Sequence, residues 1–178
     1  MAAPPPTEGV IVLYTKERTA AIKEMLSVKV ECIPEELKIR PQWVVWKAVG
    51  ERPEKVPYSA KTVRKASTTD LLSWSSFEEA NEALRSSQHY SGLGFVFSSG
   101  DPFTGIDLDG CVDPQTGGVG AWAMEIVRYF DSYTELSASG TGIHVIVKGL
   151  EVPNRRKDKV EVYSSKRFFT ITGHLLEV

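Results

Sequence analysis

One short stretch of the chain, Gly105-Ile106-Asp107-Leu108-Asp109-Gly110, alternates apolar and acidic residues. This alternation predicts a β-strand, because successive side chains of a strand point to opposite faces of the sheet. Ile106 and Leu108 would then face the core, and Asp107 and Asp109 would share the other face, roughly 7 Å apart. Two carboxylates on one face repel each other, and a divalent cation would remove that cost. The alternative is that the two aspartates end the strand and form a turn.

The segments on either side predict a domain of class α+β, with a mainly antiparallel sheet and flanking helices. Apolar and β-branched runs predict strands, and apolar residues at helical spacing predict helices. The expected strands are 43–46, 92–97, 104–109, 132–136, 143–148, 160–163 and 167–172, and the expected helices are 35–38, 77–86 and 121–131. Ser76 and Glu79 have the spacing of a capping box at the start of helix 77–86. Two prolines predict that residues 50–59 are irregular.

Residues 1–33 are expected to form an N-terminal extension of a main domain at residues 34–178. The run Pro4-Pro5-Pro6 indicates a flexible leader. Apolar positions within residues 15–28 predict a short amphipathic helix, with Thr15 as its N-cap.

The overall composition excludes several classes of protein. The chain has 178 residues, a net charge of −2 and 42% hydrophobic residues, which excludes a mainly disordered, collagen-like or coiled-coil chain. No run of apolar residues is long enough to predict a membrane span. Cys32 and Cys111 are too few for a disulfide framework and lack metal-site spacing. We therefore expect a cytoplasmic protein in a reducing environment.

Two basic clusters stand out against this nearly balanced charge. Residues 52–65 contain five basic side chains and one acid, and residues 155–167 contain six basic side chains and two acids. Such clusters are either solvated loops or surfaces that bind phosphate groups.

A turn of small residues, Ser139-Gly140-Thr141-Gly142, leads to His144 near the start of strand 143–148. Glycines let backbone N–H groups approach an anion closely, and the imidazole can donate to a phosphate oxygen or to a reacting group. The alternative is an ordinary hairpin turn, followed by a histidine that is hydrogen-bonded within the sheet.

Glu161 interrupts an apolar strand. It either faces solvent or lies beside the two aspartates as a third ligand, since glutamate is rarely buried without a partner. Arg167, on the following strand, is either a forked phosphate clamp or a surface base. Carboxylates, a glycine turn, a histidine and two basic clusters together match two-metal phosphoryl or nucleotidyl transfer.

The order of these motifs resembles the primase-polymerase (prim-pol) domain of the archaeo-eukaryotic primase superfamily, in the form found in phage and plasmid replication proteins. The matching segments are 40–46, 55–58, 65–70, 92–97, 105–109, 139–144, 160–163 and 167–173. Each segment alone is unspecific, whereas their order over residues 36–175 is specific.

The resemblance implies an archaeo-eukaryotic primase-like catalytic core at residues 34–178, acting as a DNA primase and polymerase. It implies catalysis by Asp107, Asp109, His144 and Glu161, whose three carboxylates would hold two Mg²⁺ or Mn²⁺ ions. The implied nucleotide-binding residues are Ser139, Gly140, Thr141, Gly142, His144, Arg167, Lys55 and Lys65. The implied nucleic-acid-binding residues are Arg64, Arg155, Arg156 and Lys157.

The implied partners are nucleoside triphosphates and single-stranded DNA as template and primer. Many relatives have serine where this chain has Gly142, so the backbone N–H is expected to replace a hydroxyl there. A helicase region usually follows this domain and lies outside this sequence, which is typical of a piece of a longer replication protein in a bacterial, phage or plasmid context. The alternatives are a metal-dependent nuclease with the same carboxylates and a non-catalytic module that only binds single-stranded DNA.

Overall fold

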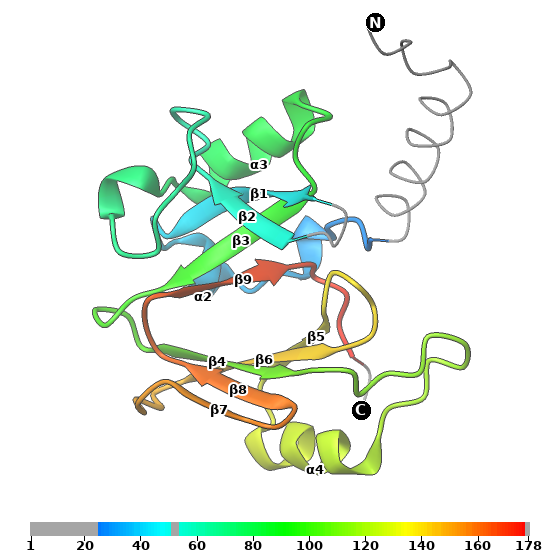
Figure 1. Ribbon diagram of the computed structural model, residues 1–178. Coiled ribbons are helices and arrows are strands. Elements are labelled where there is room, and N and C mark those ends of the chain that lie inside the picture. Colours follow the sequence, from blue (N-terminus) through cyan, green and yellow to red (C-terminus); the bar gives the residue numbers. More distant parts are fainter. Residues whose placement is uncertain (1–24, 51–53, 177–178) are drawn as a thin grey trace, which may run out of the picture.

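The computed structural model (Figure 1) describes residues 25–50 and 54–176, which form two β-sheets flanked by helices. The strand order is β2-β1-β3-β9 in the first sheet and β5-β6-β4-β8-β7 in the second. Every strand pair in these sheets is antiparallel. The α+β class is therefore confirmed, but the strands divide between two sheets rather than extending a single one.

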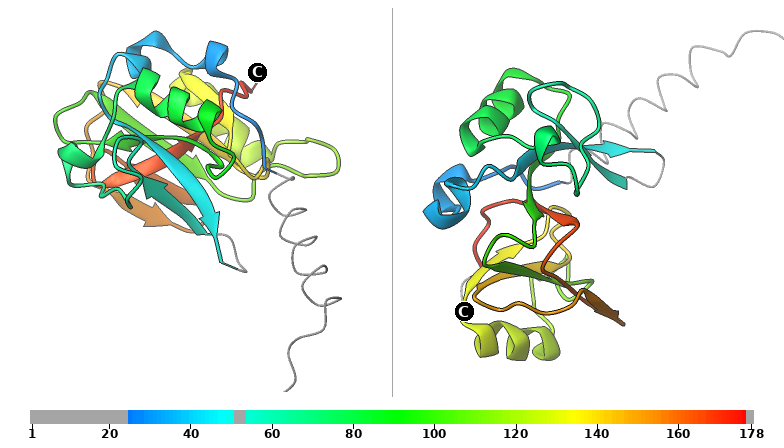
Figure 2. Two further views of the ribbon diagram at one scale, coloured as in Figure 1. Left: turned by 90° about the horizontal axis from the view of Figure 1, so that it is seen from above. Right: turned by 90° about the vertical axis from the view of Figure 1, so that its left-hand side faces the viewer.

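The first sheet contains β1 (Trp43–Val49), β2 (Glu54–Tyr58), β3 (Gly92–Phe97) and β9 (Arg167–Ile171). The second contains β4 (Phe103–Leu108), β5 (Tyr133–Leu136), β6 (Ile143–Lys148), β7 (Arg155–Lys157) and β8 (Val160–Tyr163). The helical elements are η1 (Val30–Cys32), α2 (Glu35–Lys38), η2 (Leu71–Ser73), α3 (Phe77–Ser86) and α4 (Ala121–Phe130). Figures 1 and 2 show α3 and α4 at opposite ends of the molecule, with the two sheets between them. No helix within the described residues is long and apolar enough to cross a membrane.

The expected helices and strands form within one or a few residues of their predicted bounds. The capping box at α3 is present, because Ser76 Oγ accepts the Glu79 N–H at 3.2 Å and Glu79 Oε2 accepts the Ser76 N–H at 2.9 Å.

The expectation that residues 50–59 are irregular is wrong for residues 54–58, which form β2. Pro57 pairs with Trp46 of β1, and β2 has no strand on its other side in the described structure. Proline is tolerated on such an edge strand, since its missing N–H faces away from the ladder.

The second basic cluster is not wholly a loop, because residues 155–157 form β7, the edge strand next to β8. Asp158 makes the tight turn between these two strands, with a positive φ of 52°. Three consecutive charged residues give no alternation of apolar and polar positions, so the sequence carries no strand signal here.

Residues 25–28 are not helical, which contradicts the end of the helix expected at 15–28. Backbone bonds instead dock this segment on the domain, from Leu26 N–H to Ala138 O at 2.9 Å and from Lys29 N–H to Thr172 O at 2.8 Å. Val28 packs against the core that contains the buried Ile33. The proline leader and residues 15–24 lie outside the described residues, and the domain boundary at 33/34 stays a prediction.

Aromatic side chains join the two sheets. Phe95 of the first sheet meets Phe103 of the second sheet edge to face at 5.9 Å, and Phe169 of the first sheet lies 4.8 Å from the ring of His144 in the second. Within the first sheet, Phe97 and Phe169 meet edge to face at 4.9 Å. A separate apolar cluster on the other face of the second sheet packs against α4. One face of the second sheet therefore contacts the first sheet, and its other face contacts α4.

Gly105 lets the two sheets approach closely. A Cβ atom at this position would lie 2.5 Å from the rings of both Phe169 and Phe97, which is shorter than real contacts allow. Gly105 precedes Asp107 by two residues and shares its face of β4. The absence of a side chain here therefore sets the spacing of the sheets beside the acidic residues.

We expect Gly105→Ala to lower the free energy of unfolding by about 1–3 kcal/mol, because the added methyl group overpacks the junction between the sheets. Urea denaturation would measure the change. Gly100→Ala is the matched control, since nothing lies within 4 Å of a Cβ at that position. Equal stability of the two variants would contradict the close approach at Gly105.

Candidate active site

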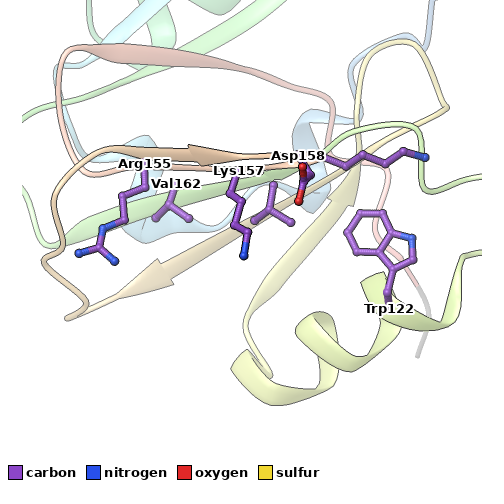
Figure 3. Close-up of a pocket in the computed structure, with 7 residues that line it drawn as sticks. Trp122, Arg155, Lys157, Asp158 and Val162 are labelled. Carbon is purple, nitrogen blue, oxygen red and sulfur yellow. The ribbon is translucent and has the colours of Figure 1, made fainter.

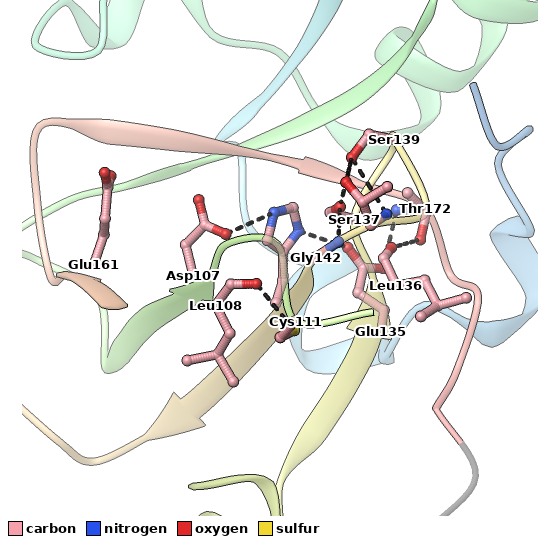
Figure 4. Close-up of polar contacts among 12 residues, drawn as sticks. Asp107, Leu108, Cys111, Glu135, Leu136, Ser137, Ser139, Gly142, Glu161 and Thr172 are labelled. Carbon is pink, nitrogen blue, oxygen red and sulfur yellow. Dashed lines mark hydrogen bonds and ion pairs between the residues drawn. The ribbon is translucent and has the colours of Figure 1, made fainter. Parts of the chain in front are cut away.

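Five polar residues lie in register across the second sheet. Each is the direct pairing partner of the next, in the order Glu135 (β5), His144 (β6), Asp107 (β4), Glu161 (β8) and Arg156 (β7). Residues directly opposite each other in an antiparallel sheet point to the same face. All five side chains therefore lie on the face that contacts the first sheet, and Glu161 lies beside Asp107 rather than behind it (Figure 4).

His144 is held between two acidic residues. Its Nε2 lies 3.8 Å from Asp107 Oδ1, and its Nδ1 lies 3.3 Å from Glu135 Oε1. The imidazole also lies against the ring of Phe169, with 4.8 Å between the ring centroids. Only 3% of His144 is exposed, so these neighbours determine where its ring nitrogens point.

Glu135 was not predicted from the sequence. It is fully buried, and its Oε2 accepts from the Tyr133 hydroxyl at 2.7 Å and from the N–H groups of Thr172 and Gly173 at 2.9 and 2.7 Å. Oε2 is thus satisfied by three donors, and Oε1 is the oxygen that faces His144 Nδ1. An acid within a strand was the only available signal, and its pairing with a histidine nine residues away appears only in the folded sheet.

Asp107 lies in an environment that opposes its ionisation. Burial raises the pKa of its carboxyl group, and the charges of Asp109 and Glu161 add to this rise. His144 and Lys55 act in the opposite direction without cancelling the effect. A divalent cation beside Asp107 would neutralise this local excess of negative charge.

Asp109 follows the end of β4 rather than lying within it. Its N–H donates to Lys159 O at 2.8 Å, and Gly110 continues the turn with a φ of +56°. The expected strand thus ends one residue early, and the alternative of a turn is correct for Asp109. Its charge nevertheless acts on Asp107, so the two carboxylates belong to one electrostatic site.

Glu161 already has cationic partners on both of its oxygens. Arg156 Nε lies 2.8 Å from Oε1, whereas the Tyr163 hydroxyl and Arg167 Nη2 lie 2.8 and 3.5 Å from Oε2. These contacts account for a glutamate that is only 4% exposed.

Within residues 25–50 and 54–176, no three His, Cys, Asp or Glu side chains converge at distances that would hold a metal ion. Asp107 and Asp109 fit a divalent cation by their oxygen chemistry and their mutual repulsion. Glu161 lies next to them, but it would have to release an arginine before it could bind a metal.

A cleft of about 670 Å³ opens beside Asp107 and His144. Its lining comes from β2, the loop after it, β9 and the second sheet, and consists of Glu54, Lys55, Pro57, Thr68, Asp107, His144, Lys166, Arg167, Phe168, Phe169 and Thr170. Lys55 is exposed as a whole residue, but partial desolvation of its ammonium group lowers the pKa of that group. The negative charges of Asp107, Asp109 and Glu135 act in the opposite direction and raise the pKa. The fold thus brings Lys55 and Arg167 to the same cleft as Asp107 and His144.

The turn at residues 139–142 uses most of its polar groups internally. Its hydroxyls form a chain from Ser137 to Ser139 at 3.1 Å and on to Thr141 at 2.9 Å, and Gly142 N–H donates to Ser137 Oγ at 3.1 Å. A Cβ at position 142 would lie 2.9 Å from Leu108 O, so glycine here lets the turn pass close to β4. The N–H expected to replace a hydroxyl is therefore engaged, and the turn does not line the cleft.

The predicted basic residues are not brought to one place. Arg64 and Lys65 lie in the loop after β2, outside the lining of the cleft. Arg156 faces the cleft side of the second sheet, whereas Arg155 and Lys157 alternate with it and face the α4 side.

The chain is similar to a DNA primase-polymerase of Nitratiruptor phage NrS-1. The two are 41% identical over 146 residues, which cover 76% of this chain and 20% of the phage protein. This chain thus spans about a fifth of the length of that relative. No family model matches the chain. The similarity confirms the resemblance that the order of the sequence motifs indicated.

We expect Glu135→Ala to lower the free energy of unfolding by on the order of 3 kcal/mol, because it leaves two buried N–H groups and the Tyr133 hydroxyl without an acceptor. Glu135→Gln retains an acceptor oxygen and should lose much less. Chemical denaturation would measure both variants, with the exposed Glu151→Ala as the control. A mild effect of Glu135→Ala would show that these bonds contribute little.

We expect Asp107→Asn to be more stable than the parent at neutral pH, because the folded protein raises the pKa of Asp107 and so disfavours its ionised form. As the pH falls through the raised pKa, the parent takes up a proton and the difference shrinks. The two proteins should converge below about pH 4, where Asp107 is protonated in both the folded and the unfolded chain. Urea denaturation across this range would measure the effect.

Asp113→Asn is the control, because the pKa of Asp113 is shifted in the opposite direction from that of Asp107. Hydrogen bonds from the backbone of Gln115 and Thr116 lower the pKa of Asp113, so its replacement should not stabilise the protein at neutral pH. If Asp107→Asn and Asp113→Asn changed the free energy of unfolding in the same way, the acidic environment of Asp107 would not be the cause.

Proposed function

We propose that this chain, a primase-polymerase domain, is a template-dependent nucleotidyltransferase that joins nucleoside triphosphates on single-stranded DNA. The observation that carries the proposal is the pairing of Asp107 with His144 and Glu161 across one sheet face, beside a cleft that also presents Lys55 and Arg167. The similarity to a phage primase-polymerase supports the same activity.

Asp107 and Asp109 are the proposed ligands of divalent ions, and Mg²⁺ or Mn²⁺ suits their oxygen atoms. Two such ions, when bound, lower the pKa of an attacking 3′-hydroxyl and stabilise the leaving pyrophosphate. Glu161 is the proposed third carboxylate, after it exchanges Arg156 or Arg167 for a metal. The charge that Asp109 and Glu161 exert on Asp107 supports this assignment.

Lys55, Arg167 and His144 are the proposed partners of the incoming triphosphate. All three line the cleft, and the two cations can neutralise phosphate charge there. His144 is oriented by Glu135 and Phe169, so its position is fixed before a nucleotide binds. Lys65 and the turn of Ser139, Gly140, Thr141 and Gly142 stay predictions, because they lie outside the cleft lining.

Template and primer are the proposed nucleic-acid partners, bound by Arg64, Arg155, Arg156 and Lys157. A helicase region of the same longer protein is a further proposed partner, in the setting of a phage, plasmid or bacterial replication protein. Both proposals follow from the family resemblance.

We expect the parent protein to incorporate labelled nucleotide on a primed DNA template in the presence of Mn²⁺. Asp107→Asn and Asp109→Asn should each reduce the rate by about a hundredfold or more, because a bound metal contributes several kcal/mol to such reactions. Asp113→Asn is the matched control, since this exposed aspartate lies outside the cleft. Full activity of Asp107→Asn would refute the metal assignment.

Two further outcomes identify the alternatives. A nuclease with the same carboxylates would cleave DNA and would not need to bind nucleoside triphosphates in the presence of Mn²⁺. A non-catalytic module would bind single-stranded DNA without incorporating or cleaving anything.

A further inference from the structure

A second groove lies on the α4 side of the second sheet, away from the cleft. Val160 and Val162 alternate with Glu161 along β8, so they face the opposite side from the acidic site. The groove has a volume of about 530 Å³, within the range of ligand pockets. Its lining consists of Trp122, Arg155, Lys157, Asp158, Lys159, Val160 and Val162.

Trp122 is the one exposed tryptophan of the chain. It lies in the first turn of α4 and is 36% exposed, whereas the other three tryptophans are at most 4% exposed. Figure 3 shows its ring rising from α4 toward the β7–β8 hairpin, which carries Arg155 and Lys157. The indole therefore presents an aromatic surface at one end of the groove.

The groove is positively charged. Three cations, Arg155, Lys157 and Lys159, line it together with one carboxylate, Asp158. Among the residues that the structure describes, neither Arg155 nor Lys157 has a carboxylate within ion-pair distance, in contrast to Arg156. Their charges are thus available to an anionic ligand.

We propose that this groove binds a segment of single-stranded DNA, with a base stacked on Trp122 and phosphates held by Arg155 and Lys157. Cations that follow a backbone and an aromatic platform that accepts any base are the two components of surfaces that bind single strands. This inference rests on the proposed function and adds a DNA contact outside the cleft.

The position of β7 explains how such a contact connects to the active site. β7 is the edge strand of the second sheet and lies two strands, roughly 10 Å, from β4 and its Asp107. Arg156 faces the acidic side of this edge, and Arg155 and Lys157 face the other side. A DNA strand that leaves the cleft and crosses β7 therefore meets cations on both faces of the sheet.

The test is a fluorescence titration of the whole chain with a single-stranded oligo-dT probe. Because the other tryptophans are buried, the change in tryptophan emission reports on Trp122. The probe should quench the parent, and Trp122→Ala should weaken binding, measured by anisotropy of a labelled probe, about tenfold. Trp122→Phe keeps a stacking ring and should retain most of the affinity.

The charged residues are tested by the dependence of binding on salt. Replacing Arg155 and Lys157 together with alanine should reduce the slope of log K against log salt concentration by about 1.4, or about 0.7 for each lost phosphate contact. Matched controls on α4 are Tyr129→Ala and Arg128→Ala, which remove an exposed ring and an exposed cation outside the groove. Both controls should bind like the parent.

The inference is overturned if oligo-dT leaves the emission unchanged, if Trp122→Ala binds like the parent, or if a nucleoside triphosphate alone produces the same quenching. Primed-template incorporation, measured in parallel, separates this result from the proposed function. If the parent incorporates nucleotide but its emission is not quenched, the proposed function stands and the proposed DNA contact in the groove is refuted. If the emission is quenched but no nucleotide is incorporated, the DNA contact stands and the proposed activity is refuted.

Discussion

The antiparallel register of the second sheet is the constraint on which the site depends. It aligns Glu135, His144, Asp107, Glu161 and Arg156 as direct neighbours across five strands. A slip of one residue in β4, β6 or β8 would turn its polar side chain to the α4 face and place an apolar one in the row. The apolar cluster beneath α4 opposes such a slip, so the same packing that stabilises the sheet also assembles the site.

The row of polar residues is stable because most of its charges have a partner. Glu135 is satisfied by three hydrogen bonds besides the one to His144, and Glu161 is satisfied by two arginines and a tyrosine. Asp107 is the exception, since burial and two neighbouring carboxylates raise its pKa. A carboxyl group whose ionised form is disfavoured by its surroundings, in a cleft, marks a candidate functional site.

The basic residues lie on edge strands of the two sheets and face different surfaces of the protein. β2 carries Lys55 to the cleft, and β9, the opposite edge of the first sheet, carries Arg167 to the same cleft. On the second sheet, Arg156 of β7 contacts Glu161, whereas Arg155 and Lys157 of the same strand face the α4 side. A basic cluster that is continuous in sequence therefore becomes two surfaces, because adjacent side chains of a strand point in opposite directions.

The sequence by itself determined the α+β class, the three α-helices and seven of the nine strands that the structure describes, because each of these is written in local periodicity and spacing. It also singled out Asp107 and Asp109 as candidates for the site. It did not reveal β2 or β7, since a proline and a run of charges carry no strand signal, and these strands form only because a neighbour offers hydrogen-bond partners. Nor did it reveal Glu135, the engagement of Glu161 by arginines, or the division of the strands into two sheets. Tertiary structure decided these features, because pairing between strands that are distant in sequence depends on register and on the packing of Phe97 and Phe169 over Gly105.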